Sequence, residues 1–370
     1  MELTCLKILY VGPDYSGSNA TSWRDAFQEL GHEVRTVDSA RLMPEPQTFL
    51  DKARQKLLAR PPSRSITRLK EVIARQAREF RPDFTFYIQA RCILPATFEE
   101  TARYGPNFGY FNDDMFNPRN QSFTFFDSIK KFDCILTTNP CNVQESYAVG
   151  APLAIYIPFA FDPKIHYPAI PSPKERVHYE GDVAFIGTFR PERADFLAQL
   201  ARFNGEFKLN IWGGGWFKLD RPIYWYKWRR WQRLRACIRG KELRCADMGK
   251  SIQSNKISLG LLNHANRDQH TYRSFEIPAC GGFMLAERTE MHRQFFEEDK
   301  EAVYFSSFEE LVEKIHYYLA HDAIRQRIAE AGYQRCIRSP YRYVDRATFA
   351  IEQFHRLHST ASRRARSCQI

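Results

Sequence analysis

The sequence predicts an α/β fold built from two parallel-sheet domains that face each other across a ligand-binding cleft. The chain has 370 residues, which is more than one hydrophobic core usually supports. Near the N-terminus a strand, loop, helix, glycine and strand follow one another, as in a βαβ unit with a parallel sheet. The same pattern begins again at residue 182. Two similar halves imply a cleft between them, where ligands usually bind.

The N-terminal domain is predicted to span residues 1–165. The apolar run LKILYV at 6–11 predicts its first strand, and the helical pattern after it ends at Gly31. Residues 50–80 predict a basic helix, and CNVQESYAVGA predicts a later helix that ends at Gly150. Further apolar runs predict strands at 32–38, 82–90, 107–113, 133–139 and 153–159.

A linker and a second α/β domain follow. Residues 160–181 contain four prolines and little periodicity, so we place a linker at 166–181. The C-terminal domain is predicted at 182–340, with an amphipathic helix after Ser307, and residues 341–370 predict a helix that crosses back to the N-terminal domain, then a tail. Strands of this domain are predicted at 182–187, 207–212, 256–263 and 282–287.

The composition narrows the class of protein. A formal net charge of +11 indicates anionic partners such as nucleotides, phospholipid headgroups or nucleic acid, with a basic but inert surface as the alternative. The nine cysteines are scattered without a C-x-x-C pair, which favours a reducing cytoplasm over a disulfide or zinc scaffold. No apolar run has the length of a membrane span, and the N-terminus lacks the features of a signal peptide. We therefore expect a cytoplasmic protein.

The loop GPDYSGSN after the first strand excludes two nucleotide-binding classes. It differs from the G-x-G-x-x-G fingerprint of dehydrogenases and from the P-loop motif. Its glycine turn still lets a ligand approach the backbone, so Gly12, Asp14 and Tyr15 are candidate contacts, with an ordinary turn as the alternative. Neither the histidine spacing nor any D-x-D motif indicates a metal site, and no G-x-S-x-G elbow supports a serine hydrolase.

The stretch FIGTFRPERADFL predicts a diphosphate site. Gly187 ends a predicted strand, and Arg190 and Arg193 stand where the next helix begins. A helix N-terminus with two guanidinium groups suits a diphosphate, and a solvated arginine pair is the alternative.

The carboxylate pair in NDD, residues 112–114, stands at the end of a predicted strand. Asp113 and Asp114 are therefore candidates to orient an acceptor hydroxyl or to line the cleft, and a strand-terminating turn is the alternative.

Residues 221–241 combine eight Lys/Arg and five Trp/Tyr with no acidic residue. Rings and cations together suit an anionic membrane interface, and they also suit nucleic acid or an insertion that packs its rings on the domain. We name 217–245 a basic aromatic insertion, and we expect an anionic membrane surface as its partner, on the inner face of the membrane.

Glu276 is a carboxylate within a stretch that otherwise reads as buried, TYRSFEIPACGG. Pro278 is tolerated only in a first helical turn, so a helix is expected to begin between Phe275 and Ile277. Glu276 at that helix start can accept two vicinal hydroxyls, as from a ribose, and capping its own helix is the alternative. We expect Glu276→Ala to weaken nucleotide-sugar binding and to leave the fold intact.

The stretch KISLGLLNHANRDQHTYRSFEIPACGGFMLAE and the helix after it resemble the C-terminal half of CgeB-type (spore-maturation-protein-like) glycosyltransferases. The resemblance continues more weakly through FIGTFRPERADFL and LKILYVGP, and it is weakest at 215–250. The R-[ST]-F-E-I-P-A-C-G-G block is its most specific part. The resemblance implies a GT-B fold of two Rossmann-like domains, with a glycosyl transferases group 1-like C-terminal domain.

The resemblance also assigns roles to residues. In the related E-x7-E motif the second glutamate binds the donor ribose and falls on Glu276, while the first falls eight residues earlier on Asp268, an aspartate where the motif has glutamate. The catalytic candidates are Asp268, which the resemblance implies, together with Asp113 and Asp114 of the NDD pair. The implied donor-binding residues are Glu276, Arg273, Arg193, Arg190, Gly187, Thr188, His270, Gly281 and Gly282, and the acceptor-side residues are Gly12, Asp14 and Tyr15.

The expected function is that of a glycosyltransferase, retaining and metal-independent, without a cofactor. It would move a sugar from a nucleotide-diphosphate sugar to a glycan, a lipid-linked or a protein acceptor. Two alternatives stay open: a sugar-nucleotide epimerase or phosphorylase with the same fold, and a non-enzymatic basic protein that binds membrane or nucleic acid.

Overall fold

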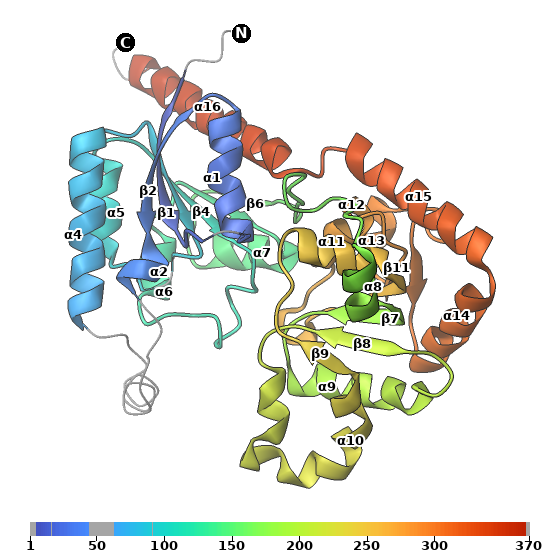
Figure 1. Cartoon of the computed structure of the whole chain (residues 1–370). Helices are drawn as coiled ribbons and strands as arrows, with labels where there is room; N and C mark the ends of the chain where they lie inside the picture. Colours follow the sequence, from blue (N-terminus) through green and yellow to red (C-terminus); the bar gives the residue numbers. More distant parts are fainter. Residues whose placement is uncertain (1–4, 16, 44–62, 91, 368–370) are drawn as a thin grey trace. The chain divides into compact units, whose positions relative to one another are not determined.

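The computed structural model describes residues 5–15, 17–43, 63–90 and 92–367 and divides into two compact units (Figure 1). Unit 1 consists of Met1–Phe159, His264–Asp268 and Arg342–Ile370, and unit 2 consists of Ala160–Asn263 and Gln269–Tyr341. Each unit has a six-stranded sheet in which every strand pairing is parallel. The predicted α/β class with two parallel sheets is therefore confirmed.

The sheet of unit 1 has the strand order β2-β1-β3-β4-β5-β6. Its strands are β1 (Lys7–Gly12), β2 (Glu33–Asp38), β3 (Phe84–Ile88), β4 (Asn107–Phe111), β5 (Cys134–Thr137) and β6 (Ala154–Tyr156). Its helices are α1 (Asn19–Glu29), α2 (Ser39–Leu42), α4 (Ser63–Phe80), α5 (Pro95–Ala102), α6 (Phe125–Ile129), α7 (Pro140–Ala148), α16 (Tyr343–Ser367) and the one-turn η4 (His264–Asn266). The central strands β3, β4 and β5 are buried along their whole length, as expected for a parallel sheet covered on both faces.

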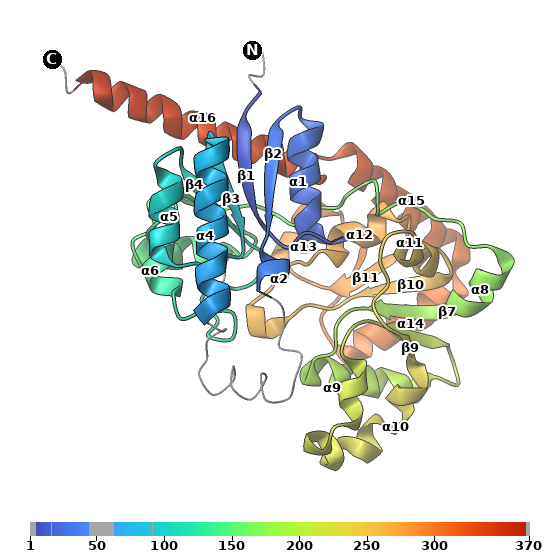
Figure 2. The ribbon, with the colours of Figure 1, turned by 60° about the vertical axis from the view of Figure 1, so that its left-hand side comes forward.

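Aromatic rings hold the layers of unit 1 together. Helices α4 and α5 lie on one side of the sheet, and α1 and α16 lie on the other (Figures 1 and 2). Because successive strand residues point to opposite faces, Tyr87 packs on Phe98 of α5, with ring centres 4.8 Å apart, while Phe86 packs on Trp23 of α1 at 4.9 Å. The C-terminal helix α16 adds Phe354, whose ring centre lies 5.2 Å from that of Phe84.

The sheet of unit 2 has the strand order β12-β11-β10-β7-β8-β9. Its strands are β7 (Gly181–Ile186), β8 (Leu209–Trp212), β9 (Ile238–Gly240), β10 (Asn255–Gly260), β11 (Met284–Glu287) and β12 (Val303–Phe305). Its α-helices are α8 (Pro173–Tyr179), α9 (Pro191–Leu200), α10 (Trp228–Cys237), α11 (Ala246–Gln253), α12 (Arg273–Ala279), α13 (Glu290–Phe295), α14 (Phe308–Ala320) and α15 (Asp322–Arg338). Its 3₁₀ helices are η1 (Ala201–Phe203), η2 (Trp216–Asp220) and η3 (Pro222–Lys227). In Figure 1, α9 and α10 lie below β7 and β8, and α11 and α12 lie above them.

Several local expectations differ from the structure. Helix α12 begins at Arg273 rather than between Phe275 and Ile277, because Pro278 is accepted inside this seven-residue helix. The linker region contains α8, which the capping box of Ser172 and Glu175 starts. The insertion at 217–245 is partly core, because Trp231, Leu234 and Cys237 of α10 are buried. The part of the predicted 50–80 helix before residue 63 lies outside the described residues.

Candidate functional site

A ligand of unit 2 is expected beyond the carboxyl ends of β7 and β10. The chain adds β8 and β9 on one side of β7, and it adds β11 and β12 on the opposite side of β10. Open α/β sheets bind ligands where the strand order reverses in this way. Gly187, Thr188 and Arg190 follow β7, and residues 261–263 follow β10. We call these two loops, together with the start of α12, the unit 2 edge site.

Arg193 ties the two loops of the unit 2 edge site together. Its Nη1 donates to the carbonyl oxygen of Thr188 at 2.9 Å, and its Nη2 donates to the carbonyl oxygens of Leu261 and Leu262 at 3.3 and 3.2 Å. Its guanidinium carbon lies 5.2 Å from the centre of the Phe185 ring. Arg193 therefore shapes the site through backbone carbonyls, and its contact with a phosphate stays a prediction.

Arg190 and Lys218 are the cations of this site that suit an anion best. Arg190 is the N-cap residue of the ten-residue helix α9. Its side chain and that of Lys218 make no hydrogen bond or ion pair with any residue that the structure describes. Lys218 lies near Gly215, in the loop after β8. Phe189 N, in the loop after β7, donates a hydrogen bond of 2.9 Å to Gly214 O of the same loop as Gly215, so the two loops are joined. Two unpaired cations and a helix N-terminus thus meet at this edge. Lys218 was not predicted from the sequence, although the three glycines at 213–215 precede it closely.

Glu276 is buried, with 1% of its surface exposed, and two basic side chains of unit 2 contact it. Arg273 Nη1 forms an ion pair with Oε2, and His166 Nε2 lies 3.4 Å from Oε1. Arg273 Nε also donates to Ile186 O at 2.8 Å, at the end of β7. The carboxylate that the sequence singled out is therefore paired, and Arg273 joins it to the strand edge.

His166 contacts Glu276 as a neutral ring. Burial, and then the charge of Arg273, lowers the pKa of His166 to about 3. The backbone N–H of Asp162 donates to Nδ1 at 3.0 Å, so Nδ1 is an acceptor and the proton belongs on Nε2, which faces Glu276. Nothing in the sequence indicated this residue, since it is one of two histidines in a proline-rich stretch without a motif.

These contacts change the expected result of Glu276→Ala. The substitution removes the carboxylate and leaves the buried His166 and the Arg273 guanidinium without it, which is destabilising. The expectation that this variant leaves the fold intact is therefore replaced by an expected loss of stability.

Three other residues predicted to bind the sugar donor, His270, Gly281 and Gly282, have contacts or backbone conformations that serve packing. His270 is buried, and its ring lies 5.1 Å from that of Phe295 and 6.0 Å from that of Phe275. Gly281 follows α12 with φ +70°, the left-handed conformation that favours glycine at a helix end. At Gly282 an added Cβ would lie 2.3 Å from a methyl carbon of Ile252, so this turn packs closely.

Asp268 and Glu276, the two acids of the E-x7-E likeness, belong to different units. The segment His264–Asp268 is part of unit 1. Arg267 of this segment binds Asp114 with Nε at 2.7 Å and Nη2 at 2.9 Å, and it also binds Glu145 at 2.8 Å. Asn139 and Asn117 hold the segment by its carbonyl oxygens at 2.7 and 2.6 Å.

The neighbouring acids Asp113 and Asp114 follow β4 and differ in their surroundings. Asp114 is buried, and it accepts from Arg267 and from Asn142 Nδ2 at 2.8 Å. Burial raises the pKa of Asp114, but the hydrogen bonds from Arg267 and Asn142 outweigh it and hold the pKa below its usual range. Asp113 is half-buried and accepts from the amides of Gln89 at 3.2 Å and Asn266 at 2.9 Å. Asp114 thus fastens segment 264–268, whereas Asp113 lines a pocket.

The acceptor-side candidates lie after β1 in unit 1. Gly12 ends the strand, and a Cβ there would lie 2.9 Å from that of Ile88 at the end of β3. Asp14 forms an ion pair with Arg24, and Tyr15 is about half exposed.

Among the described residues, no group of three or more His, Cys, Asp or Glu side chains is arranged to hold a metal ion. Within the same part of the chain, no helix combines the length and the apolar character needed to cross a membrane.

Residues 190–352 match the family model described as glycosyl transferase-like. No curated protein is similar enough in sequence to count as a relative. The match covers most of unit 2 and includes Arg190, Arg193, Arg273 and Glu276. It confirms the predicted glycosyltransferase enzyme at the level of this domain and leaves the CgeB-type subfamily a prediction.

Solved structures share the fold at low identity. Alr3699/HepE from Anabaena, in complex with UDP and glucose, has 14% identity and a TM-score of 0.59 over 94% of this chain and 99% of that one. Sucrose-phosphate synthase from Thermosynechococcus elongatus has 13% identity and a TM-score of 0.64 over 96% and 100%. A putative UDP-N-acetylglucosamine 2-epimerase from Listeria monocytogenes has 11% identity and a TM-score of 0.55 over 94% and 95%. The chain therefore has the fold of GT-B glycosyltransferases, as predicted.

Proposed function

We propose that the chain is a glycosyltransferase that moves a sugar from a nucleotide-diphosphate sugar to an acceptor hydroxyl. The observation that carries this proposal is the position of Glu276 and Arg273 at the unit 2 edge site, within the segment that matches a glycosyl transferase-like model. Solved relatives of the fold are described with UDP or UDP-glucose, which supports such a donor.

In this proposal the cations hold the donor diphosphate. Arg190, Lys218 and the N-terminus of α9 supply positive charge, which stabilises the diphosphate as it leaves. Glu276 accepts the hydroxyls of the donor ribose. Because Glu276 is buried while Arg273 is about a quarter exposed, the ribose reaches this carboxylate only when Arg273 turns aside.

Calorimetry with UDP-, GDP-, ADP- and TDP-sugars tests the proposal. We expect one of these donors to bind, and we expect Glu276→Gln, which keeps the shape of the side chain, to weaken that binding about tenfold through lost charge-assisted hydrogen bonds. Glu290→Gln is the matched control, since Glu290 is an exposed acid of the same unit. If no nucleotide sugar binds, the proposal is wrong, and unchanged affinity in Glu276→Gln removes the ribose assignment alone.

Acceptor-dependent release of the nucleotide separates the enzymatic alternatives. A transferase releases the nucleoside diphosphate faster when an acceptor is present, whereas a same-fold epimerase changes the donor without an acceptor, and a phosphorylase needs phosphate. The retaining, metal-independent mechanism is part of the proposal. It predicts a product with the donor's anomeric configuration and activity that survives EDTA.

We also propose that the basic aromatic patch of unit 2 binds an anionic membrane surface, on which a lipid-linked acceptor could be presented. The patch consists of apolar side chains that are each more than half exposed, and of cations between them: Phe217, Ile223, Trp225, Tyr226, Trp228, Arg221, Lys227, Arg229, Arg230 and Arg233. Exposed rings beside cations fit a headgroup layer that carries negative charge.

Co-sedimentation with vesicles tests the patch. We expect binding to vesicles that contain phosphatidylserine and little binding to neutral vesicles. Neutralising Arg229, Arg230 and Arg233 should abolish the difference, and neutralising Arg327, Arg335 and Arg338 of α15 is the control with equal loss of charge. Binding that these changes leave intact removes the patch from the proposal. Salt-sensitive affinity for nucleic acid without vesicle binding would favour the nucleic-acid alternative.

A further inference from the structure

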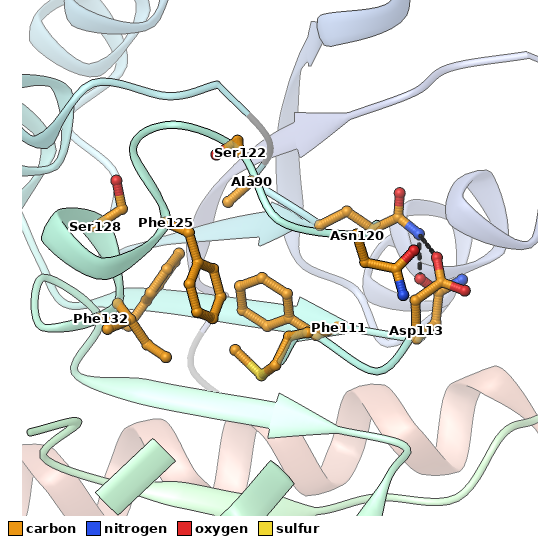
Figure 3. Close-up of a pocket in the computed structure, with 12 residues that line it drawn as sticks. Ala90, Phe111, Asp113, Asn120, Ser122, Phe125, Ser128 and Phe132 are labelled. Atoms are coloured by element: carbon orange, nitrogen blue, oxygen red, sulfur yellow. Dashed lines mark hydrogen bonds between the residues drawn. The ribbon is translucent and has the colours of Figure 1, made fainter. Parts of the chain in front are cut away.

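Unit 1 contains a pocket at the carboxyl ends of β3 and β4, beside helix α6 (Figure 3). Its floor is apolar and buried, formed by Phe111, Met115, Phe125, Ile129 and Phe132. Figure 3 shows the rings of Phe111, Phe125 and Phe132 gathered on one side and Asp113 on the other. The cavity volume is about 30 Å³, and about 10–15 Å³ accommodates one water-sized group. The pocket therefore has room for a methyl-sized group and none for a whole ring.

The rim of the pocket carries hydrogen-bonding groups of the kind that recognise hydroxyls. Gln89 Nε2 donates to Asn112 Oδ1 and, at 3.2 Å, to Asp113 Oδ2. Asn266 donates to Asp113 Oδ1 at 2.9 Å and accepts from Asn120 at 3.0 Å. Each carboxylate oxygen can accept two hydrogen bonds, so Asp113 can accept a ligand hydroxyl in addition to these amides.

The backbone at the rim adopts a sparsely populated conformation. Gln89 and Ala90 follow β3 with φ of +58° and +35°, which non-glycine residues rarely adopt. A hydrogen bond of 2.8 Å from Gln89 N to Tyr110 O helps to hold this turn. Such conformations cluster at ligand sites, and here the turn brings Gln89 to the rim.

We infer that this pocket recognises the acceptor of the proposed transfer, and that the acceptor presents hydroxyls beside a methyl-sized apolar group, as a 6-deoxyhexose does. The inference rests on the proposed glycosyltransferase function. The methyl group enters the phenyl-lined floor, and a neighbouring hydroxyl donates to Asp113. A hexose carries a hydroxyl on the same carbon, and placing that hydroxyl in the apolar floor leaves it without a partner.

Matched methyl glycosides test the inference by binding rather than by turnover. Affinities of methyl 6-deoxyhexosides and methyl hexosides in the gluco, galacto and manno series can be measured by ligand-observed NMR. We expect the deoxy sugar of one series to bind about tenfold more tightly than its partner, the discrimination typical of one small group in an apolar pocket.

Three variants assign the effect to the pocket. Asp113→Asn should lower the affinity about tenfold, because the hydrogen bond to a charged acceptor is lost. Ser122→Leu fills the half-buried mouth and should remove the preference for the deoxy sugar. Asp127→Asn on α6, an exposed acid outside the pocket, is the control and should change neither value.

The outcomes separate this inference from the proposed function. Equal affinity of both sugars in all three series, or an unchanged affinity in Asp113→Asn, overturns the inference while nucleotide-sugar binding by unit 2 stands. If the wild-type protein binds no nucleotide sugar, the proposed function is overturned. The sugar preference of unit 1 can still be measured independently.

Discussion

The two sheets of the molecule are alike in size and differ in what their carboxyl edges carry. Both have six parallel strands, with the order 2-1-3-4-5-6 in unit 1 and, counted from its own first strand, 3-2-1-4-5-6 in unit 2. At the unit 2 edge, guanidinium groups bind carbonyl oxygens and a carboxylate. At the unit 1 edge, neutral amides surround one carboxylate above a floor of rings. The difference fits an anionic ligand in unit 2 and a neutral, hydroxyl-rich one in unit 1.

Each unit also has a buried carboxylate paired with an arginine, and the two pairs differ in how far apart their residues lie in the sequence. Glu276 and Arg273 lie three residues apart on one helix, so their pair is local. Asp114 and Arg267 are 153 residues apart in the chain, so their pair closes a long loop. Substitutions in each pair therefore measure how much stability a local and a long-range pair provide.

The largest effect is expected from Glu276→Ala. Removing one partner of a buried ion pair should lower the free energy of unfolding by about 3–5 kcal/mol. Urea unfolding followed by tryptophan fluorescence measures it, since five of the six tryptophans belong to unit 2. A loss under about 1 kcal/mol would show that the pair is solvated rather than buried.

Acid should destabilise unit 2 before the carboxylates titrate. Burial lowers the pKa of His166 to about 3 and that of His292 to about 4. Below the unfolded pKa of about 6.5 the unfolded chain binds protons that the folded chain does not, so stability falls as pH falls, by about 1.4 kcal/mol per histidine and pH unit. We expect a loss of about 3 kcal/mol at about pH 5.5.

Unfolding free energies across that pH range test the sign as well as the size. The variant His292→Asn should show roughly half the slope of the wild type. A flat profile between about pH 7 and 5 would contradict neutral, buried histidines.

Arg267→Met should destabilise unit 1 by about 2 kcal/mol, less than a fully buried pair, because Arg267 is partly exposed while the Asp114 side chain is not. A double-mutant cycle with Asp114→Asn isolates the pair. A coupling energy near zero would mean that segment 264–268 is held by the Arg267–Glu145 pair and its asparagine contacts rather than by Asp114.

Gly281→Ala should have the smallest effect, a loss of about 1 kcal/mol, because alanine is strained at φ +70°. Gly205→Ala is the control, since no atom lies within 4 Å of an added Cβ there. Equal thermal midpoints for the two variants would contradict a conformational role for Gly281.

The sequence predicted the features that depend on neighbouring residues and missed those that depend on contacts between distant residues. Ten apolar runs marked strands that the structure contains, whereas β9 and β12, of three residues each, were not predicted. Glu276 stood out as a charge among apolar residues. Its partner His166 lies 110 positions away, and no spacing signal connects them. Likewise nothing local distinguished Asp113 from Asp114, because Arg267 decides the difference from a distant segment.

The composition of unit 1 from three separate pieces of chain bears on how the protein is made. Its last piece, Arg342–Ile370, leaves the ribosome after all of unit 2, and it supplies Phe354 to the core and Tyr343, whose ring centre lies 6.0 Å from that of Trp23. Domains usually fold in order of synthesis, from the N-terminus onward. Here the domain that begins first is finished last, so until Arg267 and α16 have been translated its nascent sheet has α1 but not α16 on one face, and Asp114 lacks its arginine partner.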